Sequence, residues 1–82
     1  MQIREVFALN LRRYRHAARL SQEELAHRAD IDRTYISALE RGIYGASIDV
    51  VDKLAQVLGI EAADLLRKSS TTPEGSGRRS GA

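Results

Sequence analysis

Cysteine and tryptophan are absent from this 82-residue chain, and proline occurs only once. Without cysteine there can be no disulfide framework, no cysteine-ligated zinc or iron–sulfur site and no thiol nucleophile. The length leaves room for one domain, and therefore excludes a large cleft between domains. A small domain without such cross-links depends on a compact apolar core, which closely packed helices supply most readily.

Long hydrophobic runs are missing as well. No apolar stretch approaches the ~18 residues that a membrane-spanning helix needs, so we expect no membrane partner. The first ten residues, MQIREVFALN, are interrupted by charges and show no secretory signal. These absences favour a cytoplasmic protein.

A large charge of one sign is also lacking, because the net charge is only +2. The charges are unevenly distributed: residues 1–41 sum to +2, residues 42–66 to −3 and residues 67–82 to +3. Of the 13 basic residues, 11 are arginine. The planar guanidinium suits phosphates and guanine edges, whereas lysine offers a point charge. Genome composition explains an arginine excess equally well. Only the positions of the arginines can therefore indicate whether they bind nucleic acid.

Apolar residues recur with helical spacing along most of the chain, and no segment alternates as a strand does. Helices are therefore predicted at residues 3–18, 22–29, 33–41, 48–58 and 61–67. The residues expected to face inward from the first and fourth helices are Ile3, Phe7, Leu11, Tyr14, Ala18, Ile48, Val51, Leu54, Ala55 and Leu58. The predicted fold class is an all-α, compact five-helix domain.

Residues suited to helix ends support these boundaries. Ser21, Asp32 and Ser47 each precede a predicted helix as N-caps, and Glu24 is spaced to complete a capping box with Ser21. Gly42 and Gly59 follow predicted helices, where glycine readily adopts positive φ.

The C-terminal stretch SSTTPEGSGRRSGA contains the proline, half of the glycines and no apolar residue larger than alanine. Such a segment buries too little surface to offset the entropy lost on ordering. We predict that residues 1–68 form the domain and that residues 69–82 are a disordered tail.

The short joint between the second and third helices distinguishes this chain from other small bundles. Ala26 stands where the two helices would cross, and a small side chain is needed there because a larger one would clash. Ile31, Ile36 and Leu39 are placed to hold the third helix against the second. This arrangement is typical of a helix-turn-helix, which presents its second helix to the DNA major groove.

The stretch SQEELAHRADIDRTYISALERG, followed by SIDVVDKLAQVLGIEAADLL, resembles Cro/C1-type (XRE-like) helix-turn-helix regulators such as phage repressors. The sequence DRTYIS followed by LERG is also similar to controller proteins of restriction–modification systems. The resemblance covers roughly residues 7–66. It implies a lambda-repressor-like fold, with the helix-turn-helix at helices two and three. It also implies a transcription regulator, such as a repressor, that binds double-stranded operator DNA as a homodimer.

Roles in DNA binding follow from the resemblance. It assigns base-edge contacts to Arg33, Thr34 and Ser37, with Arg33 best suited to a bidentate contact with guanine. It assigns contacts with the DNA backbone, or positioning on it, to Gln22, Tyr35, Arg41 and Arg12. Tyr35 could equally cover the helix joint. The spacing agrees, because Arg33, Ser37 and Arg41 recur every four residues and share a helix face opposite Ile36 and Leu39.

Two further groups of residues are expected to have structural roles. Arg15 and Glu40 match a pair that the family uses as an ion pair between the first and third helices. Ile60, Leu65 and Leu66 would form the dimer interface, although they could instead belong entirely to the core.

The chain departs from the family pattern in three loops. Asp30 stands where glycine is usual in the turn, and aspartate tolerates positive φ better than most residues. Arg19 replaces a glycine that often follows the first helix, and Ala46 replaces a frequent proline. These changes concern local loop conformation.

Two other classes of function compete with this interpretation. An enzyme is disfavoured because His16 and His27 lie on separate predicted helices, without a catalytic or metal-binding motif; no catalytic residue, metal, cofactor or small-molecule ligand is predicted. A protein-interaction module, such as the antitoxin subunit of a toxin–antitoxin pair, would favour an apolar recognition face. The polar and cationic third helix favours DNA, although an antitoxin that represses its own operon would use the same chemistry.

Overall fold

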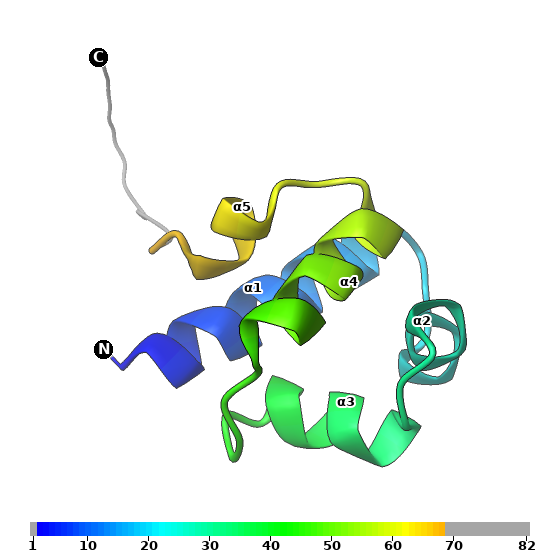
Figure 1. Ribbon diagram of the computed structural model, residues 1–82, viewed down its shortest axis with the longest axis horizontal. Coiled ribbons are helices and arrows are strands. Elements are labelled where there is room, and N and C mark those ends of the chain that lie inside the picture. Colours follow the sequence, from blue (N-terminus) through cyan, green and yellow to red (C-terminus); the bar gives the residue numbers. More distant parts are fainter. Residues whose placement is uncertain (1, 69–82) are drawn as a thin grey trace.

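The computed structural model describes residues 2–68, which form five helices and no strand (Figure 1). The helices are α1 (Ile3–Ala17), α2 (Gln22–Ala29), α3 (Arg33–Glu40), α4 (Ile48–Leu58) and α5 (Ala62–Leu66). The all-α prediction is confirmed, and every boundary lies within one residue of the predicted one. The predicted tail at residues 69–82 lies outside the described residues.

The five helices surround a single apolar core. α1 packs against α3 and α5, α2 packs against α3 and α4, and α4 packs against α5. In Figure 1, α3 and α5 lie on opposite sides of α1 and α4. The largest side chains with essentially no exposed surface come from all five helices: Leu11, Leu25, Ile36, Leu39, Leu54 and Leu65.

The predicted N-caps are formed, with one difference. The Ser21 hydroxyl accepts from the Glu24 amide at 2.9 Å, and the Ser47 hydroxyl accepts from the Val50 amide at 3.1 Å. The Glu24 carboxylate, however, accepts from Arg28 Nε at 3.0 Å instead of returning to the Ser21 amide. The predicted capping box is therefore only half formed, because an i,i+4 ion pair takes the carboxylate.

The turns use left-handed backbone where the helix ends require it. Gly42 has φ +73° and Gly59 has φ +71°, as their positions after helices predict. Asp30 adopts φ 59° and ends α2, so aspartate does take the conformation that glycine usually supplies. Arg19 adopts φ 61° between α1 and α2, a conformation that costs energy for a side chain of this size.

Three residues predicted to face inward do not. Ile3 is 58% exposed and Ile48 is 87% exposed, and Ala18, the C-cap of α1, is also exposed. All three stand at helix ends. Periodicity shows which side of a helix faces inward, but not how far the neighbouring helices extend along it.

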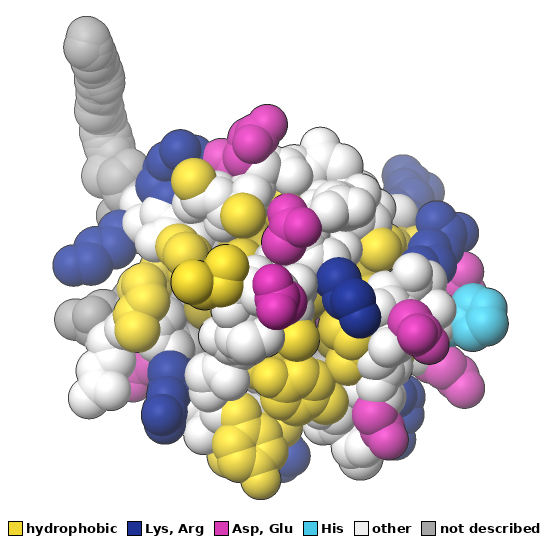
Figure 2. Space-filling view, in the orientation of Figure 1, with side chains coloured by type: hydrophobic (Ala, Val, Ile, Leu, Met, Phe, Trp, Pro, Cys, Tyr) yellow, Lys and Arg dark blue, Asp and Glu magenta, His cyan; other side chains and the backbone are white. Residues whose placement is uncertain are grey.

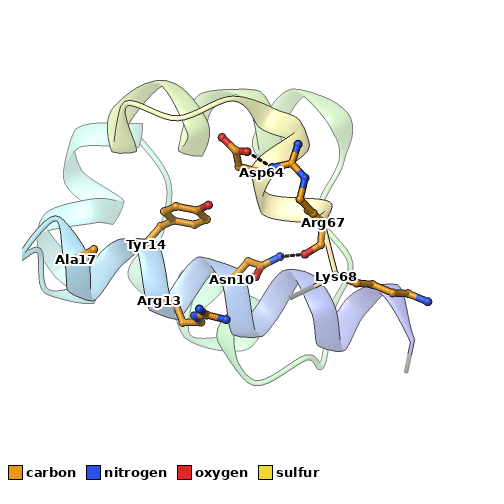
Figure 3. Close-up of a pocket in the computed structure, with 7 residues that line it drawn as sticks. All are labelled: Asn10, Arg13, Tyr14, Ala17, Asp64, Arg67 and Lys68. Atoms are coloured by element: carbon orange, nitrogen blue, oxygen red, sulfur yellow. Dashed lines mark hydrogen bonds and ion pairs between the residues drawn. The ribbon is translucent and has the colours of Figure 1, made fainter. Parts of the chain in front are cut away.

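A buried asparagine on α1 holds the C-terminal end of α5. Asn10 is 5% exposed, and its Nδ2 donates to the carbonyl oxygens of Leu65 at 2.9 Å and Arg67 at 2.8 Å. Asn10 is one of the residues that line an open groove of about 550 Å³ between α1 and α5, and Figure 3 shows its hydrogen bond there. The hydrogen bonds satisfy carbonyl groups that a helix end leaves without an intrahelical partner.

Candidate nucleic-acid interface

The outer face of α3 is polar and cationic. Arg33, Thr34 and Arg41 are exposed and Ser37 is half-buried, whereas Ile36 and Leu39 on the opposite face have no exposed surface. Arg41 is the C-cap of α3, so its side chain leaves from the end of the helix. Arg33, Thr34 and Ser37, which were assigned to base contacts, thus lie on α3 away from the side that packs into the core.

Three arginines at this surface and on α1 lack a carboxylate partner. Within residues 2–68, Arg12, Arg33 and Arg41 form neither an ion pair nor a side-chain hydrogen bond. Their guanidinium groups therefore keep all their donors for an external anion. Phosphate is a suitable acceptor, because guanidinium can bind it through two parallel hydrogen bonds.

Thr34 is more constrained than its sequence position indicates. Its hydroxyl donates to Asp32 Oδ1, and its amide donates to the same oxygen at 2.8 Å. The hydroxyl bond and then the amide bond lower the pKa of the Asp32 carboxyl below its ordinary value of 3.8. The Thr34 hydroxyl proton is thus directed to the N-cap, which leaves the hydroxyl lone pairs and the methyl group for a base.

The other end of α3 is tied to α1 and α2 through a buried carboxylate. Arg15 Nε lies 2.6 Å from Glu40 Oε2, and Arg15 Nη2 lies 3.0 Å from Glu40 Oε1. Gln22 Nε2 donates to Glu40 Oε1 at 3.0 Å. The Glu40 side chain is only 2% exposed and that of Arg15 is 11% exposed. Residues from three helices therefore converge on one carboxylate and fix the orientation of α3.

The remaining Arg15 donors reach the loop after α1. Nη1 donates to the Leu20 carbonyl at 2.9 Å, and Nη2 lies 3.3 Å from His16 Nε2. One arginine therefore links α1, the turn that leads into α2, and α3. Gln22 takes part in this network from the first position of α2, and its assigned contact with the DNA backbone stays a prediction.

Tyr35 is half-buried and packs against the core cluster. This packing agrees with a role in covering the helix joint, which stays a prediction. A phosphate contact by its hydroxyl stays a prediction.

The residues assigned to a dimer interface have three different environments. Leu65 has no exposed surface and belongs to the core, which is the alternative that the sequence left open for it, and a contact of Leu65 with a second copy stays a prediction. Ile60 is half-buried against the core, and Leu66 is 42% exposed. A five-residue helix buries one of two adjacent leucines and exposes the other, because successive side chains differ by about 100° in direction.

The part of the chain that the structure describes shows no group of three or more His, Cys, Asp or Glu residues that could hold a metal ion. In the same residues, no helix is both long enough and apolar enough to cross a membrane.

Comparison with known proteins identifies the family. Residues 11–65 match the helix-turn-helix family HTH_3. A hypothetical transcription factor from Neisseria meningitidis is 42% identical over 64 residues, which cover 78% of this chain and 60% of that protein. Control protein C.BamHI from Bacillus amyloliquefaciens is 42% identical over 65 residues, covering 78% of this chain and 80% of the relative.

A solved structure of the biofilm master regulator SinR in complex with DNA shares the fold. Its TM-score is 0.72 at 29% sequence identity, over 74% of this chain and 98% of that one. The Neisseria relative is named a transcription factor, and the Bacillus relative is named a control protein. The chain belongs to the XRE-type helix-turn-helix family of DNA-binding transcriptional regulators.

Proposed function

We propose that this chain is a cytoplasmic transcriptional regulator that binds a pseudo-palindromic operator as a homodimer. In this proposal residues 1–68 form the DNA-binding domain, and α3 of each copy enters the major groove. The two half-sites would lie about one helical turn, or ~34 Å, apart. The observation that carries the proposal is the outer face of α3, whose arginines have no ion-pair partner within residues 2–68 and whose end is held by a buried ion pair.

Base reading and phosphate binding are assigned to different residues. Arg33, at the first position of α3, is proposed to bond guanine O6 and N7, with Thr34 and Ser37 reading neighbouring edges. Arg41 and Arg12 are proposed to bind phosphates and to set the register of the protein on the duplex. Gln22 and Tyr35 would support the backbone contacts.

Selection of bound sequences from a random DNA pool tests the proposal directly. Enrichment of a two-fold symmetric sequence is expected. Arg33→Ala should lower affinity for that sequence and relax the preference at one base pair, at a cost of roughly 1–3 kcal/mol in discrimination. Arg41→Ala should weaken binding to all sequences alike and reduce the salt dependence.

The two variants serve as controls for each other. Identical effects of Arg33→Ala and Arg41→Ala would show that the division between base reading and phosphate binding is wrong. A pool without any enriched sequence would argue against operator recognition, and would favour a protein-interaction module.

A further inference from the structure

The open groove between α1 and α5 is large enough for a small molecule. Its volume is about 550 Å³, within the range of ~300–1,000 Å³ that is usual for ligand sites. One wall consists of α1 residues that share a helix face through their i, i+3, i+4, i+7 spacing: Asn10, Arg13, Tyr14 and Ala17. The other wall is formed by Asp64, Arg67 and Lys68. The sequence itself indicates no small-molecule ligand, because the two walls lie far apart in the chain.

The Asn10 carboxamide, which lines the groove, has an unused hydrogen-bond acceptor. Asn10 is 5% exposed, and its Nδ2 donates to the carbonyls of Leu65 and Arg67. Within residues 2–68, no donor bonds its Oδ1. An amide oxygen can accept two hydrogen bonds, and a buried acceptor without a partner costs free energy. A ligand with an O–H or N–H group would supply the missing donor.

Basic side chains predominate among the charged groups of the groove. Arg13, Arg67 and Lys68 line it together with one acid, Asp64, which gives the lining a formal charge of +2. Arg67 forms an ion pair with Asp64, whereas Lys68 forms none within residues 2–68. Figure 2 shows Lys and Arg side chains at the surface where α5 ends. This charge suits a phosphate monoester, which carries about −1.5 to −2 charges at pH 7.

The chemical character of the groove changes along its length. Figure 3 shows Tyr14 and Ala17 towards one end, Lys68 at the other end and Asn10 between them. Tyr14 is half-buried, so its ring packs against the core and also lines the groove. An aromatic surface, a hydrogen-bond acceptor and a positive charge therefore follow one another. A nucleoside phosphate presents the matching order of a flat base, ribose hydroxyl groups and an anionic phosphate.

We propose that this groove binds a nucleoside monophosphate. The base stacks on Tyr14, a ribose hydroxyl donates to Asn10 Oδ1, and Arg13 and Lys68 bind the phosphate. Stacking on an aromatic side chain tolerates any base, because every base has a π-face. The proposal therefore concerns the class of ligand and not one particular base.

The groove is separate from the outer face of α3. None of the residues that line the groove belongs to α3, and Figure 1 shows α3 and α5 on opposite sides of α1 and α4. A nucleotide in the groove would leave α3 accessible to DNA. The site therefore goes beyond the proposed function and does not depend on it.

NMR titration of the full chain with each of the four common ribonucleoside monophosphates tests the site. At least one is expected to bind saturably and to shift the Asn10 side-chain signal and the amide signals of Ala17 and Lys68. The amide signals of Thr34 and Ser37 on α3 should stay in place. Inorganic phosphate and the free nucleoside each make only part of the contacts, so each should bind at least about tenfold more weakly.

Two pairs of matched variants separate the proposed contacts from general effects. Lys68→Glu should weaken nucleotide binding about fivefold or more, because it places a negative charge beside the phosphate. Lys53→Glu makes the same change of charge on α4, outside the groove, and should leave the affinity unchanged. Tyr14→Leu should weaken binding about tenfold through lost stacking, whereas Tyr44→Leu, at an exposed tyrosine outside the groove, should not. Circular dichroism checks that all four variants keep their helicity.

The outcomes separate this inference from the proposed function. If no monophosphate binds, or if phosphate or nucleoside alone binds as tightly, the groove is not a nucleotide site. Shifts confined to α3, or an affinity that Lys68→Glu and Tyr14→Leu both leave unchanged, would also overturn the inference. Each of these results leaves operator selection by α3 untouched. Nucleotide binding that follows the variants as expected would support the site even if no operator sequence is enriched.

Discussion

The Arg15 guanidinium binds both carboxylate oxygens of Glu40, with Nε 2.6 Å from Oε2 and Nη2 3.0 Å from Oε1. Glu40 is the last residue of α3, and Arg15 lies in the last turn of α1. The pair is almost fully buried, so each charge depends on the other for compensation. The helix that carries the proposed base-reading residues is therefore anchored at its C-terminal end.

Loss of one member of this pair should be costly. Arg15→Met leaves the Glu40 carboxylate buried with only Gln22 as a side-chain donor, and we expect unfolding free energy to fall by ~3–5 kcal/mol. Urea denaturation measures the change. The double variant Arg15→Met/Glu40→Leu is the control, since removing both charges should recover a large part of the loss. If the double variant is as unstable as the single one, the cost comes from packing and not from an unpaired charge.

Relief of left-handed strain should stabilise the protein. Arg19 has φ 61°, and glycine reaches this conformation without the Cβ penalty that other residues incur. We expect Arg19→Gly to raise the unfolding free energy by about 0.5–1 kcal/mol, measured by thermal denaturation. Gly42→Ala is the opposite control, because φ +73° at Gly42 would strain an alanine and lower the melting temperature. A lower melting temperature for Arg19→Gly would contradict the prediction.

Asn10 should control the local stability of α5. In Asn10→Leu the carbonyls of Leu65 and Arg67 lose their Nδ2 donor, at a cost of ~1–3 kcal/mol per buried unsatisfied group. Hydrogen exchange should accelerate at the α5 amides before it does so in α2 and α3. Asn10→Asp removes the donor but keeps the shape, so it should also release α5. If hydrogen exchange instead accelerates equally at amides along the whole chain, Asn10 supports the stability of the whole core and not that of α5 in particular.

Acid should weaken the start of α3 and of α5. The Thr34 bonds lower the pKa of Asp32, and the Glu61 amide together with Arg67 lowers the pKa of Asp64, both from 3.8. A depressed folded pKa contributes stability that is complete above the unfolded value and disappears as pH falls through the folded value. We therefore expect the urea concentration at the unfolding midpoint to decrease when the pH is lowered below about 4.

Asp32→Asn isolates the contribution at α3. Asparagine still caps a helix but does not titrate, so the variant should lose less stability than the wild type between pH 4 and 2. Measured urea midpoints that fall in parallel for both proteins would show that Asp32 does not contribute to the acid transition.

Local features of the sequence were sufficient for the helices and for the joint between α2 and α3. Ser21, Asp32 and Ser47 cap helices, and Gly42 ends one, because capping depends on atoms within a few residues. The family resemblance supplied Arg15 and Glu40, which composition and periodicity alone would not have paired, since they lie 25 residues apart.

The three-dimensional arrangement decided which residues at helix ends are buried. Ile3 and Ile48 follow the apolar period but are exposed, and Leu65 is buried beside the exposed Leu66. Asn10 carried no recognisable signal in the sequence, because its significance comes from the carbonyls of Leu65 and Arg67, which are distant in the chain. Burial depends on where other helices begin and end, and a periodic pattern contains no information on those limits. The sequence alone thus determined an all-α helix-turn-helix with a cationic third helix, whereas the folded chain decided which apolar residues remain available to a partner.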